Sequence, residues 1–162
     1  RHLRAEFDDD DELIMSLVKA SLEHAQDHTG RVFDIQEVVE DHSRSETGVY
    51  WLDAVPVRSI VSITELDSDG LASTEIDDYS FSFKDGQAKL SRITTEAEQI
   101  QVTLSVGYTE DDFPEAIRSA CLFLLAHFYE NRSAIGSDKL VELPFAVKAL
   151  LDPYRVRMFA GA

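Results

Sequence analysis

The chain has 162 residues, of which 44% are hydrophobic and 28% are charged, so it is long enough to bury one hydrophobic core. Its 31 acidic residues outnumber its 15 basic residues and give a net charge of -16, which disfavours nucleic-acid binding by phosphate neutralisation. No apolar run approaches the roughly 20 residues that span a bilayer, and we therefore expect a soluble protein made in the bacterial cytoplasm, without membrane contact.

Residues 11–29 are predicted to form an amphipathic helix. Their apolar residues recur at steps of three and four, which places them on one helical face. These residues are Leu13, Ile14, Leu17, Val18, Leu22 and Ala25. Gly30 is expected to end the helix in the left-handed conformation. The acidic run from Glu6 to Glu12 fits two interpretations, a solvated helix start or an electrostatic surface used in binding.

Residues 31–108 are predicted to form an antiparallel sheet, because strand-like runs alternate with turn sequences. The expected strands are Tyr50–Leu52, Val57–Leu66, Tyr79–Phe83, Leu90–Ile93 and Ile100–Tyr108. Glycine-containing turns at Asp67–Gly70 and Asp85–Gly86 indicate tight reversals between neighbouring strands. Two of the strands, Tyr79–Phe83 and Ile100–Tyr108, alternate apolar and polar residues, so each should bury one face.

Two further helices are expected near residues 114–132 and 145–152. The first begins at Pro114 and is apolar on nearly every side, which predicts burial by its own domain or by a neighbouring subunit. The second ends before Pro153. The predicted fold class is α+β, with a mainly helical body and a small antiparallel β-sheet inserted between the first helix and the later helices, in one domain over residues 1–162.

The sequence lacks recognisable catalytic and cofactor-binding motifs. His24 and His28 have a spacing that can bind one metal ion, but Ala25 occupies the place of the zinc-protease glutamate and no third ligand is identifiable, which favours a solvated pair. The single cysteine, Cys121, has apolar neighbours and is expected to be a buried core residue. These observations favour a binding or structural role, without cofactor or metal, over an enzyme.

An ordered series of short segments spans most of the chain. They are His2-Leu3-Arg4, Asp10–Ile14, His28–Arg31, Pro56–Ile60, Leu66–Gly70, Val102–Tyr108, Pro114–Ile117, Ala126–Arg132, Leu143-Pro144 and Ala149–Arg155. In this order and spacing the series resembles the head-tail connector (adaptor) family of long-tailed phages and gene transfer agents.

The resemblance implies a structural protein at the head-tail interface of a virion. Such subunits form a homo-oligomeric ring of about twelve copies, closed by heterologous contacts, beneath the portal protein. The ring extends the DNA channel and provides the docking surface for a tail-side stopper or terminator protein. DNA passes through without specific binding, and the acidic composition fits a channel wall that repels it.

The candidate interaction tail is residues 153–162. It combines arginine, aromatic residues and methionine, which are enriched at interface cores. The predicted portal-binding residues are Tyr154, Arg155, Arg157, Met158 and Phe159. A frayed terminus is the alternative interpretation. The predicted subunit-interface residues, on the apolar helix, are Leu125, Tyr129 and Arg132.

Two other classes of protein stay open at this point. An acidic DNA mimic or regulatory protein would also explain the charge, and it should bind a basic partner without forming rings. A hydrolase built on a carboxylate cluster is the third class, and it should show activity with added divalent metal.

Overall fold

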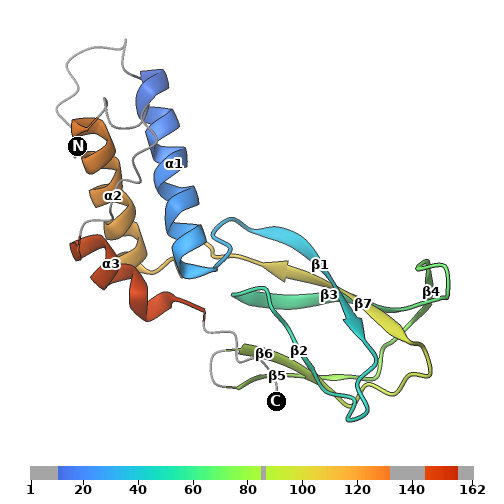
Figure 1. Cartoon of the computed structure of the whole chain (residues 1–162). Helices are drawn as coiled ribbons and strands as arrows, with labels where there is room; N and C mark the ends of the chain where they lie inside the picture. The colour runs from blue at the N-terminus through green and yellow to red at the C-terminus, as the bar shows by residue number, and fades with distance from the viewer. Residues whose placement is uncertain (1–10, 85–86, 132–144, 157–162) are drawn as a thin grey trace. The chain divides into compact units, whose positions relative to one another are not determined.

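The computed structural model describes residues 11–84, 87–131 and 145–156, and the chain divides into two compact units (Figure 1). The first unit comprises residues 1–30 and 112–157, and the second comprises residues 31–111 and 158–162. In the described residues, all the α-helices belong to the first unit and all the β-strands to the second.

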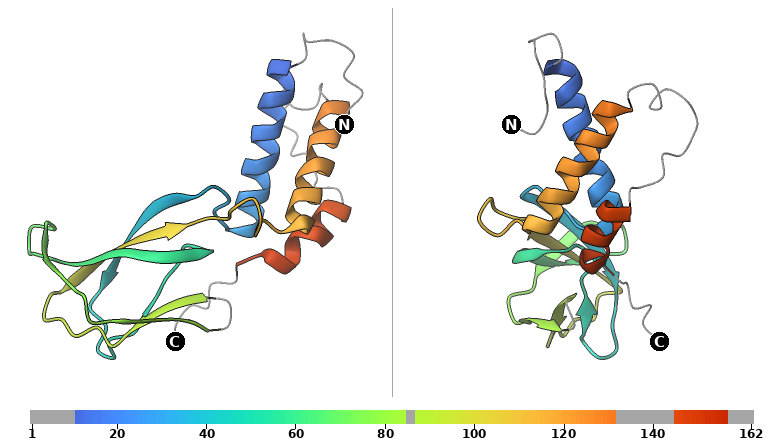
Figure 2. Two further views of the ribbon diagram at one scale, coloured as in Figure 1. Left: turned by 180° about the vertical axis from the view of Figure 1, so that it is seen from behind. Right: turned by 90° about the vertical axis from the view of Figure 1, so that its left-hand side faces the viewer.

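The helical unit contains α1 (Asp11–Thr29), α2 (Glu115–Glu130) and α3 (Phe145–Leu151), followed by a 3-10 turn, η3 (Asp152–Tyr154). α1 and α2 lie side by side in every view, and α2 also packs against α3 (Figure 2). The buried side chains of this unit include Leu17, Ala25, Ile117, Leu124, Val147 and Leu151. In the described parts of the chain, no helix is long and apolar enough to cross a bilayer.

The three predicted helices are present with small differences at their ends. α1 has the predicted bounds, whereas α2 is slightly shorter than 114–132, and α3 ends one residue before the predicted 152. Gly30 has a φ of 68° and donates its backbone N–H to the carbonyl of Gln26 at 2.7 Å, which confirms the left-handed end of α1.

The strand unit contains two antiparallel sheets. The four-stranded sheet has the order β1 (Gln36–Ser43), β7 (Gln99–Val106), β3 (Val57–Leu66) and β4 (Ala72–Glu75). The three-stranded sheet has the order β2 (Tyr50–Trp51), β6 (Gln87–Ser91) and β5 (Ser80–Lys84). Buried residues of both sheets belong to one hydrophobic core, so the sheets face each other across it.

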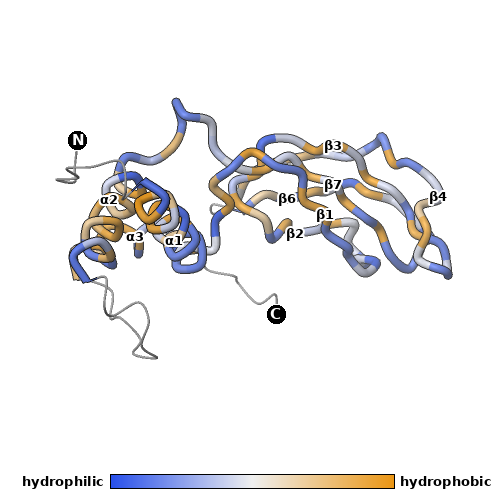
Figure 3. Tube along the Cα trace, turned by 90° about the horizontal axis from the view of Figure 1, so that it is seen from above, coloured by the Kyte–Doolittle hydropathy of each residue, from blue (hydrophilic) through white to orange (hydrophobic). Residues whose placement is uncertain are grey.

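β7 supplies the centre of this core. Its residues Ile100, Val102, Leu104 and Val106 are fully buried and alternate with partly exposed polar residues, as predicted. Figure 3 shows the corresponding alternation of orange and blue along the strands of this unit.

The expectation of a mainly helical body was wrong, because the described residues contain about as much strand as helix. The sequence pattern missed β1 and β4. Both are edge strands. Every residue of β4 is exposed, and the partly buried face of β1 carries Val38, Glu40 and His42, two of which are polar, so neither strand shows an apolar alternation in the sequence. β1 is held as a strand by its antiparallel pairing with β7, which runs over its full length from Gln36 opposite Val106 to Ser43 opposite Gln99.

The turns and the aromatic strand had mixed outcomes. The Asp67–Gly70 turn is confirmed, since the Asp67 carboxylate accepts the backbone N–H groups of Asp69 and Leu71, each at 2.9 Å. The Asp85–Gly86 turn lies outside the described residues. The expectation that the apolar residues of Tyr79–Phe83 share a buried face was wrong for Phe83, which lies on the edge strand β5 and is 62% exposed.

Candidate assembly surfaces

The surface of α2 has one buried side and one apolar exposed side. Leu124 is 1% exposed and Leu125 is 8% exposed, so both belong to the interior. Two neighbouring apolar residues, Leu122 and Phe123, are 39% and 47% exposed. Within its own chain the helix is therefore buried on one side, and burial of the other side by a neighbouring subunit stays a prediction. Exposed leucine and phenylalanine side chains on one helix form a candidate surface for a protein partner.

The three predicted subunit-interface residues have different environments. Leu125 is buried, Tyr129 is partly buried, and Arg132 lies outside the described residues. Their role in contacts between subunits stays a prediction. Sequence periodicity did not single out Leu122 and Phe123 as the exposed apolar pair, because periodicity cannot tell which part of an apolar helix its neighbours cover.

The C-terminal segment returns to the end of α1. The imidazole Nε2 of His28 lies 2.8 Å from a carboxylate oxygen of Asp152, and Val156 donates its backbone N–H to the carbonyl of Thr29 at 2.7 Å. Tyr154 is partly buried and Arg155 is exposed. The other predicted portal-binding residues, Arg157, Met158 and Phe159, lie outside the described residues. The start of the predicted tail is thus bonded to the helical unit as far as Val156.

The two histidines of α1 are partly buried and have separate partners, so the expectation of a solvated pair was wrong. His28 is paired with Asp152, whereas the ring of His24 packs edge-on against Phe128 at a centroid distance of 6.4 Å. Among the residues that the structure describes, no group of three or more histidine, cysteine or acidic side chains is arranged to hold a metal ion.

Burial gives the one cysteine an unreactive environment. Cys121 is half-buried on α2, and its burial raises the pKa of the thiol to about 11. A thiol with this pKa is almost wholly protonated at neutral pH and is a poor nucleophile. The expected unreactive thiol agrees with this environment, but Cys121 is only partly buried and is not one of the fully buried core residues that were expected.

A carboxylate of the strand unit, which the sequence did not single out, ties β1 to a distant loop. Glu40 accepts the backbone N–H groups of Asp53 at 3.1 Å and Ala54 at 2.7 Å, and it also lies 3.1 Å from the ring nitrogen of His42. Burial opposes ionisation of this carboxyl, but the three hydrogen bonds outweigh it and hold its pKa below the ordinary value. Glu40 and His42 are two residues apart, so both side chains lie on one face of the strand. The sequence could not predict their contact, because β1 was not predicted.

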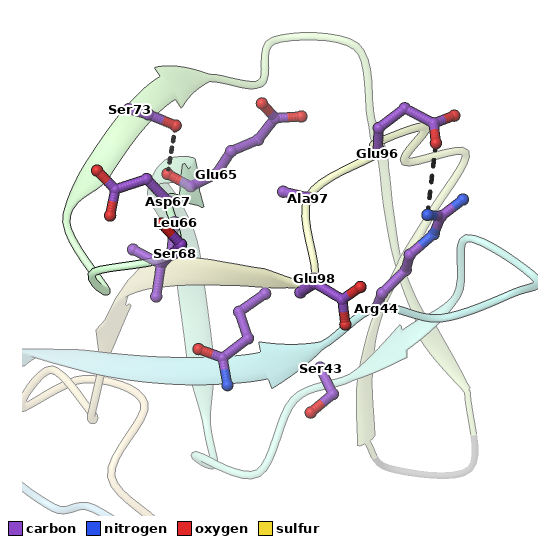
Figure 4. A pocket seen from close by; sticks show the side chains of 11 residues that line it. Ser43, Arg44, Glu65, Leu66, Asp67, Ser68, Ser73, Glu96, Ala97 and Glu98 are labelled. Atoms are coloured by element: carbon purple, nitrogen blue, oxygen red, sulfur yellow. Dashed lines mark hydrogen bonds and ion pairs between the residues drawn. The ribbon is translucent and has the colours of Figure 1, made fainter.

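An acidic hollow of about 750 Å³ lies where β1 and β3 end and β7 begins (Figure 4). Its lining includes the carboxylates of Glu65, Asp67, Glu96 and Glu98. Arg44 is also in the lining, and its guanidinium lies 3.4 Å from Glu96. The hollow concentrates negative charge at one end of the four-stranded sheet, and nothing in its geometry favours a particular ligand.

Comparison with known proteins gives structures of similar fold and a matching protein family. Three solved structures share its fold. A chain from the neck of a native gene transfer agent particle with C12 symmetry is 17% identical, with a TM-score of 0.70, and the match covers 92% of this chain and 85% of that chain. A chain from the neck of an empty particle with C6 symmetry is 18% identical, with a TM-score of 0.72 and coverages of 93% and 82%, and a chain from the virion of a native particle is 19% identical, with a TM-score of 0.76 and coverages of 99% and 88%. No sequence match was found among curated proteins. The model of the head completion protein family matches residues 2–156. Because that match covers nearly the whole chain, the protein belongs to the head completion protein family.

Proposed function

We propose that the chain is a structural head-tail connector subunit of a phage or gene transfer agent particle. The observation that carries this proposal is the match of the head completion family model to residues 2–156. The shared fold with chains from the necks of gene transfer agent particles supports a place at the joint between head and tail. The proposed role is structural and not catalytic, and it involves no cofactor.

The proposed assembly is a homo-oligomeric ring beneath the portal protein. The C12 symmetry of one related neck supports about twelve copies. A ring needs two different complementary surfaces on each subunit, because its contacts are heterologous. The exposed residues Leu122 and Phe123 of α2 supply apolar area for one of these surfaces. Tyr129 and Arg132 extend it in this proposal, while Leu125 supports the helix from its buried side.

The proposed channel wall is acidic. A net charge of -16 repels the DNA backbone, so DNA can slide through the ring without being held. The carboxylates around the hollow at the end of the four-stranded sheet add to this negative surface.

The proposed portal contact is made by the C-terminal tail. Arg155 is exposed and can form charge-assisted hydrogen bonds with portal carboxylates or carbonyls, as can Arg157, while Tyr154, Met158 and Phe159 supply apolar contacts. Asp152 and Val156 are bonded to α1, so in this proposal they hold the start of the tail, and the portal contacts come from the side chains of the other tail residues. In a ring, many weak tail contacts act together. The far side of the ring would then receive the tail-side stopper or terminator protein.

Native mass spectrometry of the purified chain with and without portal protein tests this proposal. We expect stoichiometric addition of the chain to portal rings. If the chain does not bind the portal but binds a basic DNA-binding protein, the proposal is contradicted and the acidic DNA mimic is favoured.

A further inference from the structure

We infer that His28 and Asp152, together with the backbone bond between Thr29 and Val156, form a latch that fixes where and in which direction the C-terminal tail leaves the helical unit. This inference rests on the proposed function, in which the tail docks on the portal. It adds two positioning residues, His28 and Asp152, that make no portal contact themselves.

The first point of the latch uses the free end of α1. The last carbonyls of a helix have no intrahelical donor, and the carbonyl of Thr29 receives the N–H of Val156 at 2.7 Å instead. Gly30, in its left-handed conformation, turns the chain away directly after Thr29. A Cβ atom placed on Gly30 would lie 3.6 Å from the Cβ of Val156, so Val156 rests directly over this turn.

The second point is the side-chain pair. The ring of His28 is 14% exposed, and its Nε2 donates to a carboxylate oxygen of Asp152 at 2.8 Å. Asp152 begins η3, and the N–H of Arg155 is bonded to the Asp152 carbonyl at 3.2 Å. Pro153 restricts the backbone between these residues.

Two bonds set a direction, whereas a single bond leaves the segment free to pivot. The two attachment points on the C-terminal segment, Asp152 and Val156, are four residues apart, and they bind the adjacent residues His28 and Thr29. The segment is therefore held both in position and in orientation at the point where it continues to residues 157–162.

The latch is not needed to hold the preceding helix. α3 is anchored by Val147, 1% exposed, and by Leu151, which is fully buried. The bonds of the latch act beyond Leu151, and their loss should leave the three helices in place. What they contribute is a fixed starting point at Val156, because a segment whose start is already held loses less conformational freedom on docking.

Full-length protein and purified portal rings provide the test. Asp152→Ala and His28→Ala should weaken binding to the portal about threefold to tenfold, the range expected for loss of a partly exposed charge-assisted hydrogen bond. Asp152→Asn keeps an oxygen acceptor for His28 and should bind nearly as well as the original chain. Asp27→Ala removes an exposed carboxylate next to His28 and serves as the matched control. Circular dichroism should show unchanged helix content in all four variants and a melting temperature lowered by no more than a few degrees.

Limited trypsin digestion provides a readout that does not involve the portal. Cleavage after Arg155 should accelerate about threefold to tenfold in Asp152→Ala and His28→Ala, because the peptide bond is released from the latch, but not in Asp27→Ala. Unchanged cleavage would overturn the latch, as would a loss of helix content in Asp152→Asn.

A truncation that removes residues 157–162 separates this inference from the proposed function. If the truncated chain loses portal binding while the latch variants bind normally, the latch is wrong and the tail contact stands. If the truncated chain binds the portal as well as the full chain does, the proposed tail contact fails, and the role of the latch in docking fails with it.

Discussion

Two leucines of α2, two residues apart, separate folding from assembly. Leu124 is 1% exposed, so Leu124→Asp removes its apolar packing, at a cost of about 2–5 kcal/mol, and adds the cost of burying an unpaired carboxylate, about several kcal/mol more. The summed loss is comparable to the whole free energy of unfolding of a typical domain, about 5–15 kcal/mol. We expect the helical unit of this variant to be unfolded or to melt far below the original chain.

The same substitution at Leu122 should act differently. Leu122 is 39% exposed, so the new carboxylate can stay hydrated and the change in unfolding free energy should remain within about 1 kcal/mol. In the proposed ring this position faces a neighbouring subunit, and a charge there should prevent assembly.

Circular dichroism melting and negative-stain electron microscopy with portal rings measure the two effects. Leu124→Asp should lose helical signal, whereas Leu122→Asp should melt normally and form no rings. Normal melting of Leu124→Asp would refute the placement of α2 in the core. Normal rings from Leu122→Asp would refute the assignment of this side of α2 to the subunit contact.

Three more predictions concern the strand unit and the charge. Gly107 has a φ of 103°, and an added Cβ would lie 2.2 Å from the carbonyl oxygen of Asp34, so Gly107→Ala should lower the free energy of unfolding by about 3 kcal/mol or more in a denaturant titration. At Gly70 an added Cβ would meet no atom within 4 Å, so Gly70→Ala should cost about 1 kcal/mol, and equal losses in the two variants would contradict this reasoning. Glu40→Gln should cost about 1–3 kcal/mol at pH 7. Because the folded state lowers the pKa of Glu40, this difference should be complete above the ordinary glutamate pKa of 4.5 and should shrink as the pH falls through the folded-state value; a difference that grows in acid would show that the sign is wrong. The isolated chain should bind duplex DNA negligibly at physiological salt, and salt-sensitive submicromolar binding in a filter or anisotropy assay would contradict the passive channel.

The sequence predicted elements well where burial imposes a regular period. Residues 11–29 and 57–66 were placed with their observed bounds, because α1 has an apolar stripe and β3 a long β-branched run. β1 was missed because its residues, among them Glu37, Glu40 and Asp41, are mostly polar and its conformation comes from pairing with β7. Pairing between distant segments is not written in the local pattern of either one.

The candidate surfaces were predictable only in outline. Helical periodicity identified α2 as an assembly candidate, but the exposed pair Leu122 and Phe123 emerged only from its packing. Pro153 marked the end of α3, yet the bonds of Asp152 and Val156 to α1 join residues more than 120 positions apart. Side-chain spacing along the chain carries no information about such contacts.

Cryo-electron microscopy of the purified chain bound to its portal protein tests the central claim most directly. The proposal predicts a closed ring of about twelve copies, a number that matches the C12 symmetry of the related neck. The ring should be stacked on the portal with the C-terminal residues at the contact and acidic residues lining the channel. Portal particles that remain bare at saturating concentrations of the chain would contradict a connector role.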